Sequence, residues 1–90
     1  MDRNFMVGDV VESISGHDQN RLSIIVGIDK NGFLAIIDGR YRKKTKPKLK
    51  NPRHLKFVAH DDNLLEKVNS PISTDAEIYK LIKAHKQIKE

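Results

Sequence analysis

The residues with the clearest chemical role are basic side chains concentrated in one segment, 40–53. Eight of its positions carry lysine or arginine and none carries an acid: Arg40, Arg42, Lys43, Lys44, Lys46, Lys48, Lys50 and Arg53. The chain has a formal net charge of +5, so these eight cations leave −3 for the remaining residues. Such a cluster repels itself unless a polyanion neutralises it, and lysine mixed with arginine suits phosphate contacts. The segment therefore predicts binding to a nucleic-acid backbone.

The aromatic residues indicate which nucleic acid to expect. Tyr41 is the only aromatic residue inside the basic segment, and we expect Phe33 and Phe57 in the core. Proteins that bind single strands stack successive bases on exposed rings, and such rings are scarce here. We therefore expect a folded RNA, recognised by its shape and phosphate geometry, with Tyr41 as a candidate stacking residue.

Other kinds of chemistry find little support in the sequence. The histidines His17, His54, His60 and His85 lack the short spacing of metal ligands, and the chain has no cysteine. No serine lies in a nucleophile elbow, and the glycines do not form a phosphate-cradling loop. We expect no enzyme, metal site or cofactor, and we interpret His85 as a satisfied core or interface residue.

Alternating apolar residues predict the strands that must position the basic segment. Residues 22–28 have the two-residue period of a strand, although Ile25 breaks its polar side. Asn31-Gly32 is typical of a tight hairpin turn and leads into a second strand at 33–37.

Three further short strands complete the β-rich part of the chain. Residues 7–15 form one, with a slip in alternation between residues 10 and 11 that is typical of a bulge. A turn at Asp38-Gly39 predicts a return strand at 40–45, and residues 54–58 supply the last. In a flat sheet these short strands would leave unpaired edges, and closing the sheet into a barrel removes them. We therefore expect a mostly β fold, a small SH3-like barrel over residues 1–60.

The C-terminal part of the chain predicts a connector and a helix. Residues 61–73 are polar and are interpreted as a connector. Thr74 and Glu77 match a capping box, and the apolar residues that follow predict an amphipathic helix over 74–89. This helix could dock on the barrel or on a partner.

The apolar runs also bear on localisation. Residues 1–9 contain no apolar run like that of a secretory signal, and the longest run, 33–37, has five residues. A bilayer span needs roughly 20. We expect a cytoplasmic protein with no membrane partner and no small-molecule substrate.

The N-terminal half resembles a known family. The resemblance is to the KOW motif, a strand-loop-strand unit of several ribosomal proteins and transcription factors, and rests on Val7-Gly8-Asp9-Val10-Val11, Ser15-Gly16, Asn20-Arg21-Leu22, Ile24-Ile25-Val26 and Ile28. The continuation resembles bacterial relatives of the eukaryotic-type large-subunit ribosomal proteins fourteen, six and twenty-seven, through Ile36-Ile37-Asp38-Gly39, Lys46-Pro47-Lys48 and His54-Leu55. The resemblance to this family covers residues 7–57 and does not include the C-terminal helix.

The resemblance implies that the loop between the first two strands contacts RNA through His17, Asn20 and Arg21. KOW loops usually carry a glycine near Asn20 and another near residues 22–23, and neither is present. Asparagine tolerates left-handed backbone better than most residues and can replace the first glycine. The second loss predicts a loop of different shape.

These observations predict non-catalytic binding of structured RNA, with ribosomal RNA or the ribosome as the expected partner. The alternative is a protein-interaction module of a transcription or translation complex that uses the barrel and the C-terminal helix.

Overall fold

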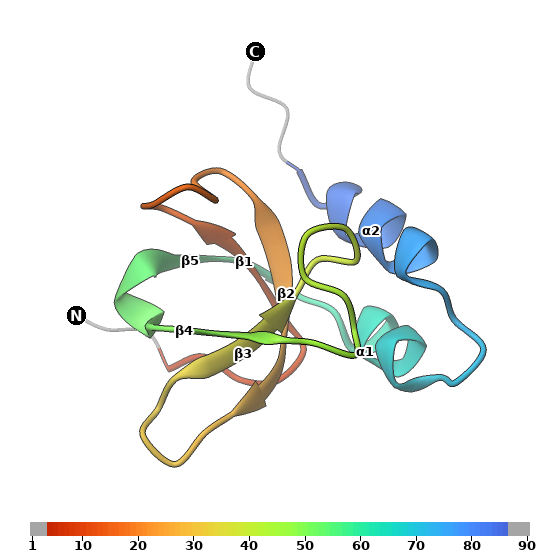
Figure 1. Ribbon diagram of the computed structural model, residues 1–90, viewed down its shortest axis with the longest axis horizontal. Coiled ribbons are helices and arrows are strands. Elements are labelled where there is room, and N and C mark those ends of the chain that lie inside the picture. The colour runs from red at the N-terminus through yellow and green to blue at the C-terminus, as the bar shows by residue number, and fades with distance from the viewer. Residues whose placement is uncertain (1–3, 87–90) are drawn as a thin grey trace.

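A computed structural model describes residues 4–86, which form one five-stranded antiparallel sheet and two short α-helices (Figure 1). The elements in chain order are β1 (Asp9–Ser13), β2 (Leu22–Ile28), β3 (Leu34–Ile37), β4 (Lys48–Lys50), the 3₁₀ turn η1 (Pro52–His54), β5 (Leu55–His60), α1 (Asp62–Asn69) and α2 (Asp75–Lys83). The mostly β character predicted from the sequence is confirmed.

The sheet has the strand order β4-β3-β2-β1-β5, so the last strand returns to pair with the first. The slip predicted between Val10 and Val11 is confirmed, because the register between β1 and β5 shifts there. Within residues 4–86, β4 and β5 lie at the two ends of the sheet and do not pair with each other. The sheet is therefore open, and the predicted closure into a barrel is not seen.

Two neighbouring turns show where the predicted strands begin and end. The hairpin turn at Asn31–Gly32 is confirmed, with φ +86° at Gly32. Phe33 belongs to this turn and is 39% exposed, so its predicted place in the core is wrong. The strand predicted at 40–45 is also wrong, because one oxygen of Asp38 accepts three successive backbone N–H groups and curls the chain. The fourth strand begins only at Lys48, after Pro47.

Residues 61–73, predicted as a connector, contain helix α1. Asp61 caps it by accepting the backbone N–H of Leu64 at 2.9 Å. Leu64 and Val68 lie one turn apart and are both buried, which gives this short helix an apolar face.

The central strands of the sheet are buried on both faces. One core contains Val10, Ile24 and Ile37 together with residues of both helices. The opposite face holds a second core, which includes Val11 and Ile25. This arrangement explains why Ile25 interrupts the polar side of its strand: that side also faces a core.

Helix α2 docks on the sheet rather than standing free. The predicted capping box is confirmed by reciprocal hydrogen bonds between Thr74 and Glu77. Ile78 and Ile82 are at most 2% exposed and belong to the helix-side core. The helix ends at Lys83, earlier than predicted, and residues 87–89 of its predicted span lie outside the described part of the chain. Neither helix within residues 4–86 is long and apolar enough to span a membrane.

Candidate nucleic-acid interface

The loop between β1 and β2 contains one residue with left-handed backbone. Asn20 adopts φ +72°, and it is the only residue other than glycine with a positive φ among residues 4–86. Its backbone N–H donates to the carbonyl of Ser13, and that of Arg21 donates to the carbonyl of Asp18. These bonds fold the loop tightly and set the direction in which Arg21 leaves it.

Lys50 holds this loop in place from β4. Its ammonium nitrogen lies 2.7 Å from both carboxylate oxygens of Asp18. Partial burial disfavours the charge of Asp18, but the hydrogen bond and positive charge of Lys50 outweigh that effect and lower the pKa of Asp18. Lys50 is 8% exposed, so it positions the loop and is not available to a phosphate.

The segment between β3 and β4 lies against the start of α2 (Figure 1). The backbone N–H of Lys44 donates to a carboxylate oxygen of Asp75 at 2.8 Å. The Lys44 ammonium donates to the carbonyls of Ser70 and Ser73 at 3.1 and 2.7 Å. Gly39 packs so closely on the helix that a β-carbon there would lie 2.8 Å from the backbone nitrogen of Tyr79. Lys44 therefore fastens the segment to α2.

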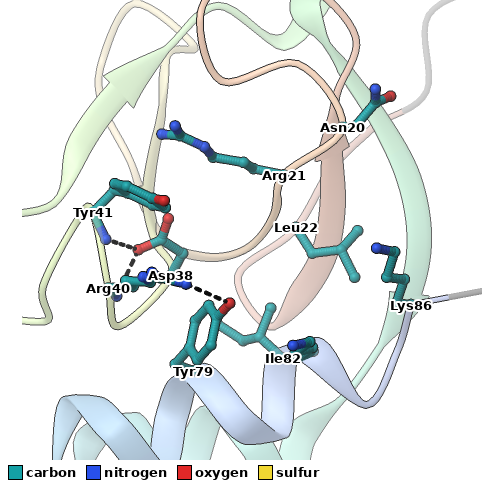
Figure 2. A pocket seen from close by; sticks show the side chains of 10 residues that line it. Asn20, Arg21, Leu22, Asp38, Arg40, Tyr41, Tyr79, Ile82 and Lys86 are labelled. Atoms are coloured by element: carbon teal, nitrogen blue, oxygen red, sulfur yellow. Dashed lines mark hydrogen bonds between the residues drawn. The ribbon is translucent and has the colours of Figure 1, made fainter.

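A pocket of about 220 Å³ opens where the two loops meet α2 (Figure 2). It brings together three parts of the chain that lie far apart in sequence. Its lining residues are Asn20, Arg21, Leu22, Asp38, Arg40, Tyr41, Tyr79, Ile82, Lys83 and Lys86.

Cations and tyrosine rings are layered along one side of this pocket. The guanidinium of Arg21 lies 3.6 Å from the ring centroid of Tyr41, and that of Arg40 lies 5.3 Å from it. Arg40 also donates a hydrogen bond of 3.2 Å to the hydroxyl of Tyr79. This bond raises the pKa of Arg40 and lowers the pKa of Tyr79. These cation–π contacts and this hydrogen bond connect the β1–β2 loop, the basic segment and α2.

The electrostatic character of the pocket is positive. Its lining contains four cationic side chains and one acid, Asp38. Asp38 is 5% exposed, and one of its oxygens accepts the backbone N–H groups of the 38–42 turn, each at 2.8 Å. Its charge is thus engaged by the turn, whereas Arg40, Lys83 and Lys86 are exposed. The pocket can therefore accept an anion.

The predicted site residues fall into three groups. Four of them line the pocket: Asn20, Arg21, Arg40 and Tyr41. Lys44 and Lys50 are engaged within the protein, so the phosphate contacts predicted for them do not fit their geometry. The others lie outside the pocket, and their RNA contacts stay a prediction: His17, Arg42, Lys43, Lys46 and Arg53 are exposed, and Lys48 is half-buried on β4.

Helix α2 and the residues just after it also contribute to this site, although no site residue was predicted there from the sequence. Tyr79, Lys83 and Lys86 all line the pocket. Tyr79 and Lys83 are four residues apart, a spacing that places them on one stripe of α2, and Lys86 follows just beyond the end of the helix. The four-residue spacing of Tyr79 and Lys83 can be read from the sequence. The stripe that these two residues form lies beside the apolar stripe of Ile78 and Ile82.

No protein-family model and no curated protein matches this sequence.

Proposed function

We propose that this protein binds structured RNA without catalysing a reaction, and that its target is ribosomal RNA. The observation that carries the proposal is the cationic pocket, where the β1–β2 loop, the basic segment and α2 meet. Arginine supplies forked N–H donors to phosphate oxygens, and lysine supplies mobile point charges.

A group of exposed cations extends this surface along the basic segment. Arg42, Lys43 and Lys46 are exposed, and no carboxylate among residues 4–86 lies within ion-pair distance of them. Their charges are therefore free to neutralise phosphates. With the exposed cations of the pocket, contact with about four to six phosphates gives a log–log salt slope of roughly −3 to −5.

The fold proposal follows the resemblance. We propose that the sheet is a relative of the SH3-like KOW barrels, in which a strand-loop-strand unit presents the RNA-binding loop. The left-handed backbone of Asn20 supports it, since by the resemblance a KOW loop usually carries a glycine near this position. The return of β5 to β1 supports it as well, since four sequential strands followed by such a return resemble an SH3-like connectivity.

The test compares two double variants that change the net charge equally. Lys43→Glu with Lys46→Glu alters the proposed surface, and Lys30→Glu with Lys67→Glu alters exposed lysines outside the pocket and the basic segment. Affinity for a ribosomal-RNA hairpin is measured from 50 to about 300 mM salt. We expect the first variant to bind more weakly and to flatten the salt slope by about one for each lost phosphate contact. The control should retain most of the affinity.

Crosslinking in cells extends the same test to the natural target. The proposal expects wild-type protein to recover ribosomal RNA at a discrete site and the Lys43→Glu, Lys46→Glu variant to lose it. A flat salt response, or equal losses in both double variants, would contradict the proposed surface.

A second candidate function is a protein-interaction module, which a different surface favours. A groove beside β5 and the β2–β3 turn is lined by apolar residues that include Ile14 and Ile28, 47% and 48% exposed. An apolar segment of a protein partner would suit it. This function predicts that Ile14→Ser and Ile28→Ser abolish partner capture while Lys43→Glu has little effect, the reverse of the ranking for RNA.

A further inference from the structure

We propose that the pocket between the two loops and α2 receives one unpaired nucleotide of the RNA, with its base inside the pocket and its phosphate at the rim. This inference rests on the proposed function and specifies the RNA: a helix interrupted by a bulge or loop rather than a continuous duplex.

The floor of the pocket is apolar, which a phosphate alone would not require. Leu22 and Ile82 both line the pocket, and Ile82 is 2% exposed because it belongs to the helix-side core. A nucleobase has an apolar face that gains from such contact, whereas a phosphate in the same position would lose its hydration. The floor therefore favours a planar ring.

The walls supply stacking groups of the kind that hold extruded bases. Tyr41 is 50% exposed, and the guanidinium of Arg21 stacks on it at 3.6 Å from the ring centroid. Tyr79 lies on α2 opposite the loops (Figure 2). Unpaired RNA bases stack on aromatic rings and on arginine planes, and both kinds of surface line this pocket.

The rim supplies the charge for the phosphate of the same nucleotide. Arg40 uses one nitrogen to donate to Tyr79, which leaves further N–H donors of its guanidinium for an anion. Lys83 lies one helical turn after Tyr79, Lys86 lies just beyond the end of α2, and both are exposed and line the pocket. A base inside the pocket thus has cations at the rim of the same pocket for its phosphate.

The pocket is held in shape without a ligand. Lys50 fixes the β1–β2 loop through Asp18, and Lys44 fixes the basic segment to the start of α2. At the other end of the helix, a ring nitrogen of His85 lies 2.7 Å from a carboxylate oxygen of Asp61. Such anchoring reduces the ordering cost that binding would otherwise carry.

The experiment uses the full chain and two RNA hairpins that differ by one bulged purine. The bulged base is 2-aminopurine, whose fluorescence falls when it stacks, and the second hairpin is fully paired. Stacking of one base corresponds to about 5- to 150-fold tighter binding, which we expect for the bulged hairpin. The fluorescence of its 2-aminopurine should fall on binding.

Three variants assign the effect to the pocket. Tyr79→Leu keeps an apolar side chain but removes the ring, so we expect it to lose the preference for the bulge and to keep its affinity for the paired hairpin. Tyr79→Phe retains the ring and should retain the preference. Phe33→Leu removes an exposed ring at the β2–β3 turn and should behave like wild type.

The outcomes separate this inference from the proposed function. If both hairpins bind equally, or if Tyr79→Leu keeps the bulge preference, the nucleotide pocket is refuted while RNA binding stands. If neither hairpin nor any other structured RNA binds, both fail. If Tyr79→Leu unfolds the protein, quenching of the bulged 2-aminopurine by the wild type still decides, because an unquenched base contradicts stacking.

Discussion

Replacing Lys50 with methionine removes the ammonium that ties β4 to the β1–β2 loop while keeping the length of the aliphatic chain. The ammonium makes two contacts of 2.7 Å with Asp18, and the two side chains are 8% and 19% exposed. If Lys50 positions the loop, its loss costs stability. If Lys50 were an exposed phosphate ligand, removing its ammonium would weaken RNA binding and leave the stability of the fold unchanged.

The magnitude follows from the burial of the pair. Breaking a fully buried ion pair costs about 3–5 kcal/mol, and hydrogen bonds to charged groups contribute about 1.5–3 kcal/mol. Asp18 keeps some contact with water, so we expect Lys50→Met to lower the free energy of unfolding by about 2–3 kcal/mol. In a domain of this size that corresponds to a fall in Tm of about 8–24 °C.

Urea denaturation of a double-mutant cycle measures the pair directly. Adding Asp18→Asn to Lys50→Met removes the unpaired carboxylate, so the double variant should cost about 1–2 kcal/mol less than the sum of the two single changes. Lys43→Met is the matched control, because Lys43 is exposed and surface changes usually stay within about 0.5 kcal/mol. A Lys50→Met variant as stable as Lys43→Met would refute the positioning role.

Three other predictions follow. Gly39→Ala should destabilise by at least about 1–2 kcal/mol and weaken RNA binding, because Gly39 has φ +82° and its added β-carbon would meet α2. Thermal denaturation checks this against Gly32→Ala, where φ is +86° but the space is open. Hydrogen bonds that His60 donates to Asp9 and then to Asp62 raise its pKa above the ordinary 6.5, so its stabilisation is full below pH 6.5 and is lost as pH rises through the raised value. Urea midpoints from pH 5.5 to 8.5 should therefore fall more steeply for wild type than for His60→Gln. Asp18, whose pKa is lowered, stabilises above its ordinary 3.8 and loses this effect in more acidic solution, so the stability advantage of wild type over a variant whose Lys50–Asp18 pair is replaced by Met and Asn should shrink in urea denaturation as the pH falls below 3.8.

Local sequence signals predicted the parts of the fold that depend on near neighbours. The capping box at Thr74, the turn at Asn31–Gly32 and the slip at Val10–Val11 each depend on residues a few positions apart, and each is confirmed. The helix within 61–73 was missed because it is short and its polar residues conceal the pair Leu64 and Val68. A capping aspartate followed by that i, i+4 pair was the available signal.

The parts that could not be predicted depend on distant partners. In the sequence, Lys44 and Lys50 cannot be told apart from the other cations of the basic segment. In the structure they bind groups that are 26 to 32 positions away in sequence. Nothing local distinguishes a lysine that meets a carboxylate from one that meets water. In the same way, the place of Tyr79 in the pocket depended on how α2 docks, which the sequence left open.

The short edge strand β4 has a consequence for how this protein behaves at high concentration. β4 has three residues, with Pro47 before it and Pro52 shortly after it, and Lys48 and Lys50 at its two ends. An exposed sheet edge can recruit a strand from another molecule, and short length, proline and lysine are the features that oppose such pairing. Pro47 and Lys48 thus also oppose self-association, and replacing them with strand-forming residues should promote pairing between molecules at this edge.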